Sequence, residues 1–414
     1  MQQTTVDLTD LDMFEQDRAW PAFDYLRREE PVYWNPEPPP NKGFWAVTRH
    51  ADIVAVDRDP ETFTSEKFVN LEELDEETME IRRSMLETDG PRHHALRRLL
   101  VRDFGTTTLK GYESFLRGLT RATVEAALRH KEFDFVSEVS ADFPIQVLAR
   151  MLDVPEHHTG RLIAWGNRMI GNTDPDYADV LLYSPESNKY RHLPFRSPAA
   201  LEVFEYGREL ARQRRGRSGQ DLVSKLVNQM PEDGVPLSQR DFDNYFLLLV
   251  IAGNETTRHA ISHSMLALIN NPDQMRLLQD RPELIPQAVE EFLRWASPVY
   301  HFRRTATRDV ELHGKHIRAG DKVVMWFASG NRDEEVFTDP YRFDVTRHPN
   351  DHVTFGKGSP HFCLGNKLAR MEIRIMFETL LPRIKRMELA GDVSYVRSSF
   401  IHGVKKMPVR VTLA

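Results

Sequence analysis

The chain of 414 residues has a single cysteine, Cys363, which lies in the glycine-rich stretch 355–365, FGKGSPHFCLG. The residues after it alternate apolar and polar at helical spacing, so we expect Cys363 where a loop enters a helix. Amide N–H groups and the positive end of that helix would favour a thiolate. A thiolate held in this way can bind a metal. The alternative is a free cysteine buried at an apolar helix start.

A second unusual stretch interrupts a long apolar helix. Ser238 with Asp241 resembles a capping box, and no residue ends the helix before Pro272. Residues 245–251, YFLLLVI, are apolar all round and place this helix in the centre of the protein. The next residues, AGNETT at 252–257, put a glycine and a carboxylate into that core, where both are costly. We therefore expect function there; the alternative is a helix kink with Glu255 in a structural ion pair.

Two charged pairs have spacings that place them on one face of a helix. His93 and Arg97 are four residues apart, and Glu291 and Arg294 are three apart. Either pair alone is typical of an ordinary helix surface, so neither indicates a function without the other motifs.

The stretch around Cys363 resembles the haem-ligand loop of the cytochrome P450 family, F-G-x-G-x-H-x-C-x-G. The matching residues are Phe355, Gly356, Gly358, His361, Cys363 and Gly365. Phe355 lies eight residues before the cysteine, one more than the commonest spacing. The other motifs follow the family's order: His93 with Arg97, the segment Ala252-Gly253-Asn254-Glu255-Thr256, and Glu291 with Arg294.

The resemblance implies a role for each matching residue. Cys363 would be the axial ligand of haem b, within a loop that includes Phe355, Gly356 and Gly365. The basic residues His93, Arg97, Arg304 and His361 would neutralise the haem propionates, with Arg303 a weaker candidate. Ala252 and Gly253 would open a groove above the iron, and Glu255 and Thr256 would deliver protons to bound oxygen. Glu291 and Arg294 would form a buried network, with Phe343 and Arg332 as partners.

The resemblance also indicates the walls of a substrate pocket. Candidates near the strands are Val299, Tyr300, Phe302, Phe400 and Ile401. The acidic segment 66–87 would border the pocket through Phe68, Val69, Leu71, Leu74 and Met79, or else be a solvated helix. Residues 171–197 contain three prolines and have no helical period, which suggests a lid. Its apolar residues are Tyr177, Leu181, Leu182, Leu193 and Phe195; the alternative is a surface excursion without a binding role.

The resemblance covers nearly the whole chain and implies a mainly α fold with a smaller β-rich lobe near the N-terminus, as a single cytochrome P450-like domain over residues 1–414 without a fused reductase. The net charge of −7 argues against nonspecific nucleic-acid binding. A single cysteine requires no oxidising compartment. The N-terminus is polar and acidic, so we expect neither a signal peptide nor a membrane anchor. We expect the protein to be cytoplasmic and monomeric.

The implied function is a haem-thiolate monooxygenase that inserts one oxygen atom of O2 into a C–H bond of a hydrophobic terpenoid, sterol or lipid-like molecule. Electrons would come from a separate ferredoxin or flavodoxin, docked on a basic face of Lys357, Lys367, Arg370 and Arg374. A second hypothesis is a haem protein that senses gas or ligand without turnover; the pair Glu255-Thr256 argues against it and against a peroxide-driven relative. A third is a zinc site at His352, His361 and Cys363, which lacks the spaced ligand pairs of zinc folds.

Overall fold

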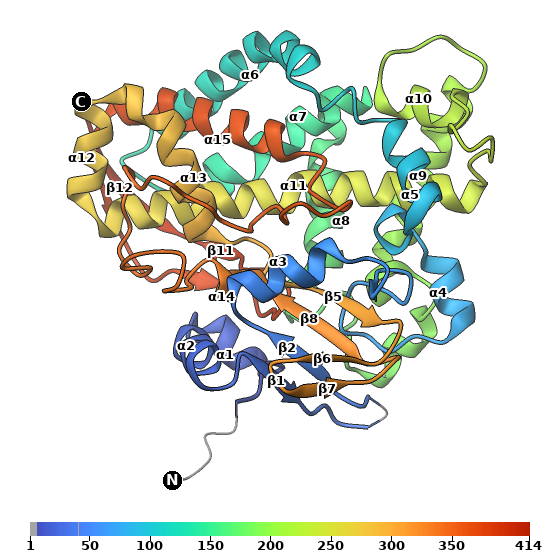
Figure 1. Ribbon diagram of the computed structural model, residues 1–414. Coiled ribbons are helices and arrows are strands. Elements are labelled where there is room, and N and C mark those ends of the chain that lie inside the picture. The colour runs from blue at the N-terminus through green and yellow to red at the C-terminus, as the bar shows by residue number, and fades with distance from the viewer. Residues whose placement is uncertain (1–5, 40) are drawn as a thin grey trace.

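The computed structural model describes residues 6–39 and 41–414 and shows a large helical part above a smaller part rich in strands (Figure 1). The helices are α1 Leu11–Glu15, α2 Trp20–Glu29, α3 His50–Arg58, α4 Glu76–Arg82, α5 Gly90–Arg98, α6 Thr106–Ala127, α7 Asp142–Leu152, α8 Thr159–Ile170, α9 Ala199–Arg214, α10 Leu222–Asn228, α11 Gln239–Asn270, α12 Pro272–Asp280, α13 Ile285–Ala296, α14 Phe327–Gly330 and α15 Asn366–Leu380. The mainly α fold with a smaller β lobe is thereby confirmed.

The central helix is α11, and its start follows from its sequence. The Ser238 hydroxyl accepts a hydrogen bond from the Asp241 amide at 3.1 Å, and the Asp241 carboxylate accepts one from the Ser238 amide at 2.9 Å. The helix ends at Asn270, two residues before Pro272. It packs against α7, α8, α9, α13 and α15, so most of its residues are buried on every side. The predicted central helix is confirmed.

The strands form one larger sheet and three small ones. They are β1 Val32–Asn35, β2 Phe44–Val47, β3 Phe63–Thr64, β4 Glu132–Asp134, β5 His301–Ala306, β6 Val310–Leu312, β7 Lys315–Ile317, β8 Lys322–Trp326, β9 Ile384–Leu389, β10 Ser394–Tyr395, β11 Val404–Lys406 and β12 Pro408–Leu413. The five-stranded sheet has the order β1-β2-β8-β5-β3. Its β2–β8 pair is parallel, with Ala46 opposite Val324. This pairing joins the N-terminal strands to residues almost 280 positions later in the chain.

The two segments expected to border a pocket are largely irregular. Residues 171–197 form turns and two short 3₁₀ segments between α8 and α9. In the segment 66–87, the only α-helix is α4. Its start follows from the Asp75 carboxylate, which accepts a hydrogen bond from the Thr78 amide at 2.7 Å.

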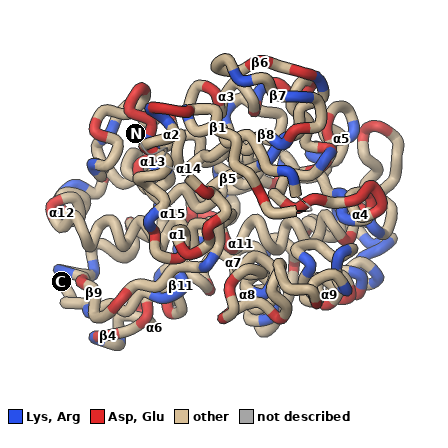
Figure 2. The backbone as a smooth tube through the Cα atoms, turned by 90° about the horizontal axis from the view of Figure 1, so that it is seen from below, with Lys and Arg blue, Asp and Glu red and all other residues tan. Residues whose placement is uncertain are grey.

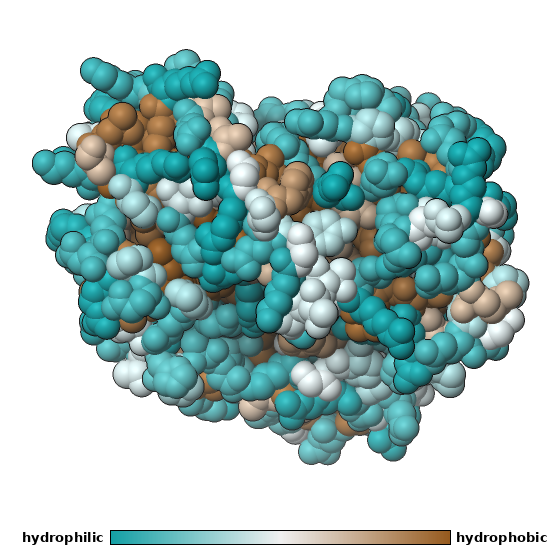
Figure 3. Space-filling model, turned by 90° about the horizontal axis from the view of Figure 1, so that it is seen from above, coloured by the Kyte–Doolittle hydropathy of each residue, from teal (hydrophilic) through white to brown (hydrophobic). Residues whose placement is uncertain are grey.

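Charge and hydropathy are distributed as in an ordinary globular protein. Lys, Arg, Asp and Glu intermix along the outer loops and helices in the view from below (Figure 2). The face seen from above is mostly hydrophilic, with small separate hydrophobic patches (Figure 3). Within residues 6–39 and 41–414, no helix is both long enough and apolar enough to cross a membrane.

Candidate functional site

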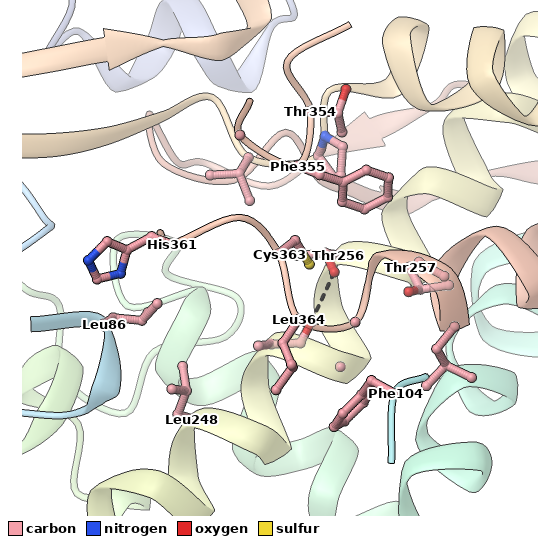
Figure 4. A pocket seen from close by; sticks show the side chains of 18 of the residues that line it. Leu86, Phe104, Leu248, Thr256, Thr257, Thr354, Phe355, His361, Cys363 and Leu364 are labelled. Carbon is pink, nitrogen blue, oxygen red and sulfur yellow. Dashed lines mark hydrogen bonds between the residues drawn. The ribbon is translucent and has the colours of Figure 1, made fainter. Parts of the chain in front are cut away.

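A cavity of about 240 Å³ lies between α11 and the loop that precedes α15. Figure 4 shows Cys363 on this loop and Thr256 on α11, both in the cavity wall. The predicted site residues that line the cavity are His93, Arg97, Ala252, Gly253, Thr256, Val299, Phe302, Arg304, Phe355, Gly356, His361, Cys363 and Gly365. The structure therefore brings together residues that are up to 272 positions apart in the sequence.

The cysteine loop is shaped by two glycines and one backbone hydrogen bond. Gly356 and Gly358 have φ angles of 75° and 72°, in the left-handed region that side chains disfavour. A Cβ atom at Gly358 would also collide with the guanidinium of Arg58. The Cys363 amide donates to the Phe355 carbonyl at 2.9 Å, which closes the loop just before α15 begins. The predicted position of Cys363 at a helix entrance is confirmed.

The protonation of the free thiol differs from the prediction. Burial raises the pKa of the Cys363 thiol, although the Gly365 amide and the Arg97 guanidinium act in the opposite direction. The amide N–H groups expected to favour a thiolate are present, and Arg97 acts with them, but desolvation outweighs both. A metal cation beside the sulfur would supply the missing stabilisation, because a coordinating thiol is deprotonated by its metal.

Basic side chains gather along the cavity wall. His93 is buried, and burial, the His361 ring and Arg97 lower its pKa to about 3. Its Nδ1 atom has no hydrogen-bond partner among the described residues. Arg97 donates to the Phe362 carbonyl at 2.6 Å, and Arg304 pairs with buried Asp57 at 2.9 Å. Two cations and an unpaired imidazole nitrogen therefore line this wall.

His361 completes this basic group. Its ring lies 4.2 Å from the His93 ring, and its Nε2 atom lies 2.8 Å from Asp89 Oδ1. Burial would raise the pKa of Asp89, but hydrogen bonds from His361 and Thr64 lower it to about 2. Arg303, the weaker candidate, does not line the cavity. It donates instead to the backbone carbonyls of Glu72 and Asn70.

These observations fit a flat, largely apolar cofactor that carries carboxylates. Ala252 is exposed although it lies in the middle of the central helix, so its surface faces the cavity and not a neighbouring side chain. The orphaned Nδ1 of His93 and the cations Arg97 and Arg304 suit carboxylates, and the Cys363 sulfur suits an iron ion. The residues present therefore fit haem b.

The acid and the alcohol of the AGNETT stretch have different surroundings. The Thr256 hydroxyl donates to the Ala252 carbonyl at 2.9 Å and lines both this cavity and a second one beside it. Glu255 lines only the second of these two cavities. Its carboxylate accepts from Arg258 at 2.5 Å and from the side-chain amide of Asn254 at 2.9 Å. Burial alone would raise the pKa of Glu255, but Arg258 and His259 lower it overall.

The second cavity has a volume of about 120 Å³ and holds most of the remaining pocket candidates. Val299 and Phe302 line both cavities, and Phe400 and Ile401 line the second. Tyr300 differs from the prediction because its ring packs on the Phe14 ring at 4.8 Å, in the apolar cluster of the N-terminal lobe.

The segment 66–87 lines the cavities partly with residues other than those expected, and the segment 171–197 contributes fewer wall residues than expected. Phe68 and Val69 line the second cavity, whereas Leu71, Leu74 and Met79 line neither of the two. From the lid, Phe195 lines the second cavity, together with Pro194. Leu181 is 40% exposed, and Tyr177, Leu182 and Leu193 also lie outside both walls.

Glu291 and Arg294 form a fully buried pair behind the cysteine loop. Arg294 donates two hydrogen bonds to Glu291, at 2.7 and 2.8 Å. Asn350 donates to the same carboxylate at 2.9 Å, and Arg347 forms a further ion pair with it at 3.2 Å. These two partners were not predicted.

The two partners that were predicted for this network act differently. Arg332 donates to the backbone carbonyls of Arg294 and Trp295, at 2.9 Å each, and so supports the end of α13. Phe343 stacks on Phe292 with ring centroids 6.0 Å apart. Neither side chain bonds to the Glu291 carboxylate, so their contribution is to backbone and packing.

Other residues of the site were missed by sequence reasoning. Glu372 lines the first cavity from α15, and burial raises its pKa well above the usual range, opposed by a hydrogen bond from Thr257. A carboxylate on the apolar face of α15, between Leu368 and Met376, is the signal that could have revealed it. Arg258 could have been found from its spacing of three residues from Glu255.

The basic face around the cysteine loop is largely neutralised by acids. Arg370 pairs with Glu290 at 2.7 Å, and Arg374 pairs with Glu378 at 3.0 Å and with Glu113 at 3.3 Å. Lys357 pairs with Asp351. Lys367, by contrast, is exposed and contacts the Thr106 hydroxyl at 3.2 Å.

The zinc hypothesis finds no support in the geometry. His352 is occupied by Glu290, with Nε2 3.1 Å from Oε2, whereas His361 pairs with Asp89. Among the residues that the structure describes, no group of three His, Cys, Asp or Glu side chains is arranged to hold a metal ion.

Comparison with known proteins identifies the family. Residues 47–386 match the family model described as Cytochrome P450. The chain is 38% identical to linalool 8-monooxygenase of Pseudomonas putida, over 97% of this chain and 98% of that protein. It is 38% identical to a methyl-branched lipid omega-hydroxylase of Mycobacterium tuberculosis, over 94% of this chain and 90% of that protein.

Solved structures agree with this assignment. A Mycobacterium marinum cytochrome P450 in complex with pseudoionone superimposes with a TM-score of 0.89 at 38% identity, and 99% of each chain is covered. The monooxygenase names of the relatives leave the hypothesis of a non-catalytic haem sensor unsupported. The chain belongs to the cytochrome P450 family, and it is accordingly a haem b-binding monooxygenase that uses O2, a hydrophobic substrate and a redox partner.

Proposed function

We propose that the protein hydroxylates a C–H bond of a terpenoid, sterol or branched-lipid-like molecule, with its haem held by Cys363. The observation that carries the proposal is the pair of adjoining apolar cavities with Thr256 and Phe302 in both walls. One cavity offers space beside the cysteine, and the other extends that space for a substrate. Relatives named for linalool, methyl-branched lipids and steroids support this substrate range.

The cofactor would be held by residues of both cavity walls. Cys363 would bind the iron, and Phe355, Gly356 and Gly365 would shape the loop around the sulfur. His93, Arg97, Arg304 and His361 would receive the propionates, because buried carboxylates need charged or N–H partners. Ala252 and Gly253 would leave the opposite face open.

When bound, the haem supplies the reductive activation of O2 that the amino acids cannot provide. The residues of the chain would position, shield and protonate. Thr256 would turn its hydroxyl from the Ala252 carbonyl into the cavity and hold a proton there. Glu255 would renew that proton from the second cavity after loosening its contact with Arg258. The apolar walls would exclude bulk water and so limit the loss of protons and electrons to side reactions.

The redox partner would be a separate ferredoxin or flavodoxin, and we propose that the 414 residues form one domain. Most cations near the cysteine loop form ion pairs with acids of this chain, so on docking they would pair with acids of the redox partner instead. Lys367 is exposed and is the most accessible of these cations. The hydrophobic patches on the face in Figure 3 are small and separate, which supports a monomer. The single cysteine suits a reducing cytoplasm, and we propose that location.

The ligand assignment is tested by the spectrum of the reduced carbonyl complex. Wild-type protein should show the red-shifted Soret band that is typical of thiolate ligation. Cys363→Ala should lose this band and most of its haem, while Thr257→Ala, on α11, should keep both. A thiolate band in Cys363→Ala would contradict the assignment.

The activity is tested with a surrogate ferredoxin and its reductase, NADPH, and a panel of linalool, a methyl-branched fatty acid and a sterol. We expect a hydroxylated product from at least one compound. Thr256→Ala should bind it with unchanged affinity but yield several-fold less product per NADPH, with the difference recovered as hydrogen peroxide. Thr256→Ser keeps the hydroxyl and serves as the control. An unchanged product ratio in Thr256→Ala would remove this residue from proton delivery.

A further inference from the structure

The second cavity has a polar region in an otherwise apolar wall. The polar residues Asn70, Arg82, Ser84 and Glu87 come from the stretch 70–87, which includes α4, and Asn244, Glu255 and Thr256 come from α11. The same cavity reaches Thr256 on α11, so it joins this polar region to the site of oxygen chemistry.

Arg82 is buried with unused hydrogen-bond donors. Its side chain is 1% exposed, and its Nη2 atom donates to Glu72 at 2.9 Å. The guanidinium lies over the Phe68 ring, 4.7 Å from the ring centroid. Its Nε and Nη1 atoms have no hydrogen-bond partner within residues 6–39 and 41–414. Buried guanidinium N–H groups are costly when unpaired, so these two donors are available to a ligand.

The charges around Arg82 leave a positive excess. Glu72 lies between two guanidinium groups, since Arg196 donates to its other oxygen at 2.5 Å. Burial alone would raise the pKa of Glu72, but Arg82 and Arg196 lower it overall, so one carboxylate is shared by two cations. Glu87 accepts hydrogen bonds from the Ser84 hydroxyl and amide, at 2.6 and 3.0 Å, and burial raises its pKa. Glu87 is the carboxylate that could cancel this excess positive charge, and its raised pKa makes it easier to protonate than Glu72.

We propose that Arg82 anchors the carboxylate of an amphipathic substrate, whose apolar chain extends past Phe302 and Val299 toward Thr256. A buried cation with unused N–H donors suits a carboxylate, and the apolar remainder of the cavity suits a hydrocarbon chain. This inference rests on the proposed function and narrows its substrate class to acids that are oxidised at a distance from their carboxylate.

The test measures binding to the holoprotein with four probes of equal chain length: dodecanoic acid, methyl dodecanoate, dodecan-1-ol and dodecane. Dissociation constants come from calorimetry and from the ligand-induced shift of the haem spectrum. We expect the acid to bind wild-type protein about tenfold more tightly than the ester. Arg82→Met should abolish that preference and leave the binding of dodecane unchanged.

Two further variants keep the test decisive. Arg83→Met is the matched control, because Arg83 is adjacent, 35% exposed and paired with Glu80 outside the cavity; it should keep the preference for the acid. Arg82→Lys retains the charge without the fork and should keep part of the preference. Folding of Arg82→Met is favoured because Glu72 retains Arg196 as a partner.

Equal affinity of wild-type protein for acid and ester would overturn the inference, as would an acid preference that survives in Arg82→Met. Its failure is distinguishable from that of the proposed function. A protein that prefers the acid but hydroxylates none of the probes or the terpenoid, lipid and sterol panel would contradict the proposed function alone. A protein that hydroxylates dodecane and the acid without preference in binding would contradict the Arg82 subsite alone.

Discussion

Gly166 on α8 leaves the space that the Glu255 carboxylate on α11 occupies. A Cβ atom at Gly166 would lie 2.6 Å from Glu255 Oε1 and 3.2 Å from Asn254 Nδ2. Glu255 is buried and held in this place by Arg258. A side chain at Gly166 would therefore force the carboxylate to move away from its partner.

Gly166→Ala should therefore displace Glu255 and weaken proton delivery. We expect a lower yield of product per NADPH, more hydrogen peroxide, and a loss of stability of about 1–3 kcal/mol from overpacking. Gly160→Ala is the matched control, because it lies on the same helix with no atom within 4 Å of the added Cβ. If both variants keep wild-type coupling, the position of Glu255 is not important for proton delivery.

The buried pair Glu291–Arg294 makes a prediction about folding. Glu291→Gln would leave Arg294 and Arg347 without a charged partner in the protein interior, at a cost of about 3–5 kcal/mol. We expect a lower melting temperature and reduced haem content, with the turnover of the remaining holoprotein little changed.

The control for this variant is Glu283→Gln. Glu283 and its partner Arg281 are 65% and 57% exposed, so losing this pair should hardly change the melting temperature. Equal melting temperatures of Glu291→Gln and Glu283→Gln would show that the buried network contributes nothing to stability.

Local sequence rules were sufficient for the central helix and the cysteine loop. The start of α11 follows from the side chains of Ser238 and Asp241, and the loop follows from glycines within eight residues of Cys363. Motif order then located Arg97 and Arg304 in the cavity wall. Such features depend on nearby residues or on a recognisable family pattern, and both can be read from one sequence.

Contacts between distant segments could not be read in this way. The pairing of His361 with Asp89 joins residues 272 positions apart, and the aromatic cluster that takes up Tyr300 depends on Phe14. The unused donors of Arg82 become visible only when the whole cavity is assembled. These features arise from tertiary packing, which overrides what the type of a single residue suggests.

Buried histidines should make the protein sensitive to acid. His301 on β5 is fully buried, and neither ring nitrogen has a partner in the part of the chain that the structure describes. Burial lowers the pKa of His301 from 6.5 to about 3. Below pH 6.5 the unfolded chain binds a proton that the folded protein does not, so stability falls as the pH falls from 6.5 toward 3.

His301→Phe should reduce this loss. Over the range in which only the unfolded state is protonated, one such histidine contributes about 1.4 kcal/mol per pH unit. Melting temperatures between pH 7 and pH 5 should therefore fall less steeply in His301→Phe than in the wild type. His316→Gln on β7 is an exposed control and should retain the wild-type slope. An equally steep fall in His301→Phe would exclude this residue as a source of the acid sensitivity.

The last prediction concerns the segment 171–197, which lines the second cavity through Pro194 and Phe195. Phe195 lines that cavity, and its carbonyl accepts a hydrogen bond from the Asn172 side chain at 2.9 Å, so the two ends of the segment are tied together. Phe195→Ala should weaken the binding of ligands long enough to reach the second cavity about three- to tenfold, because an apolar contact is lost. Ligands that fit beside Cys363 should bind as before.

Leu181→Ala provides the control within the same segment, since Leu181 is 40% exposed and lies outside both cavity walls. Hydrogen exchange gives a second readout. A saturating long ligand should slow exchange in 171–197 more than in α11, because α11 is already buried and hydrogen-bonded without ligand. Equal exchange with and without ligand, together with unchanged affinities in Phe195→Ala, would mean that this segment is a surface excursion. A lid that closes over the substrate requires both effects, because closure must add contacts to the ligand and must order residues 171–197, which make those contacts.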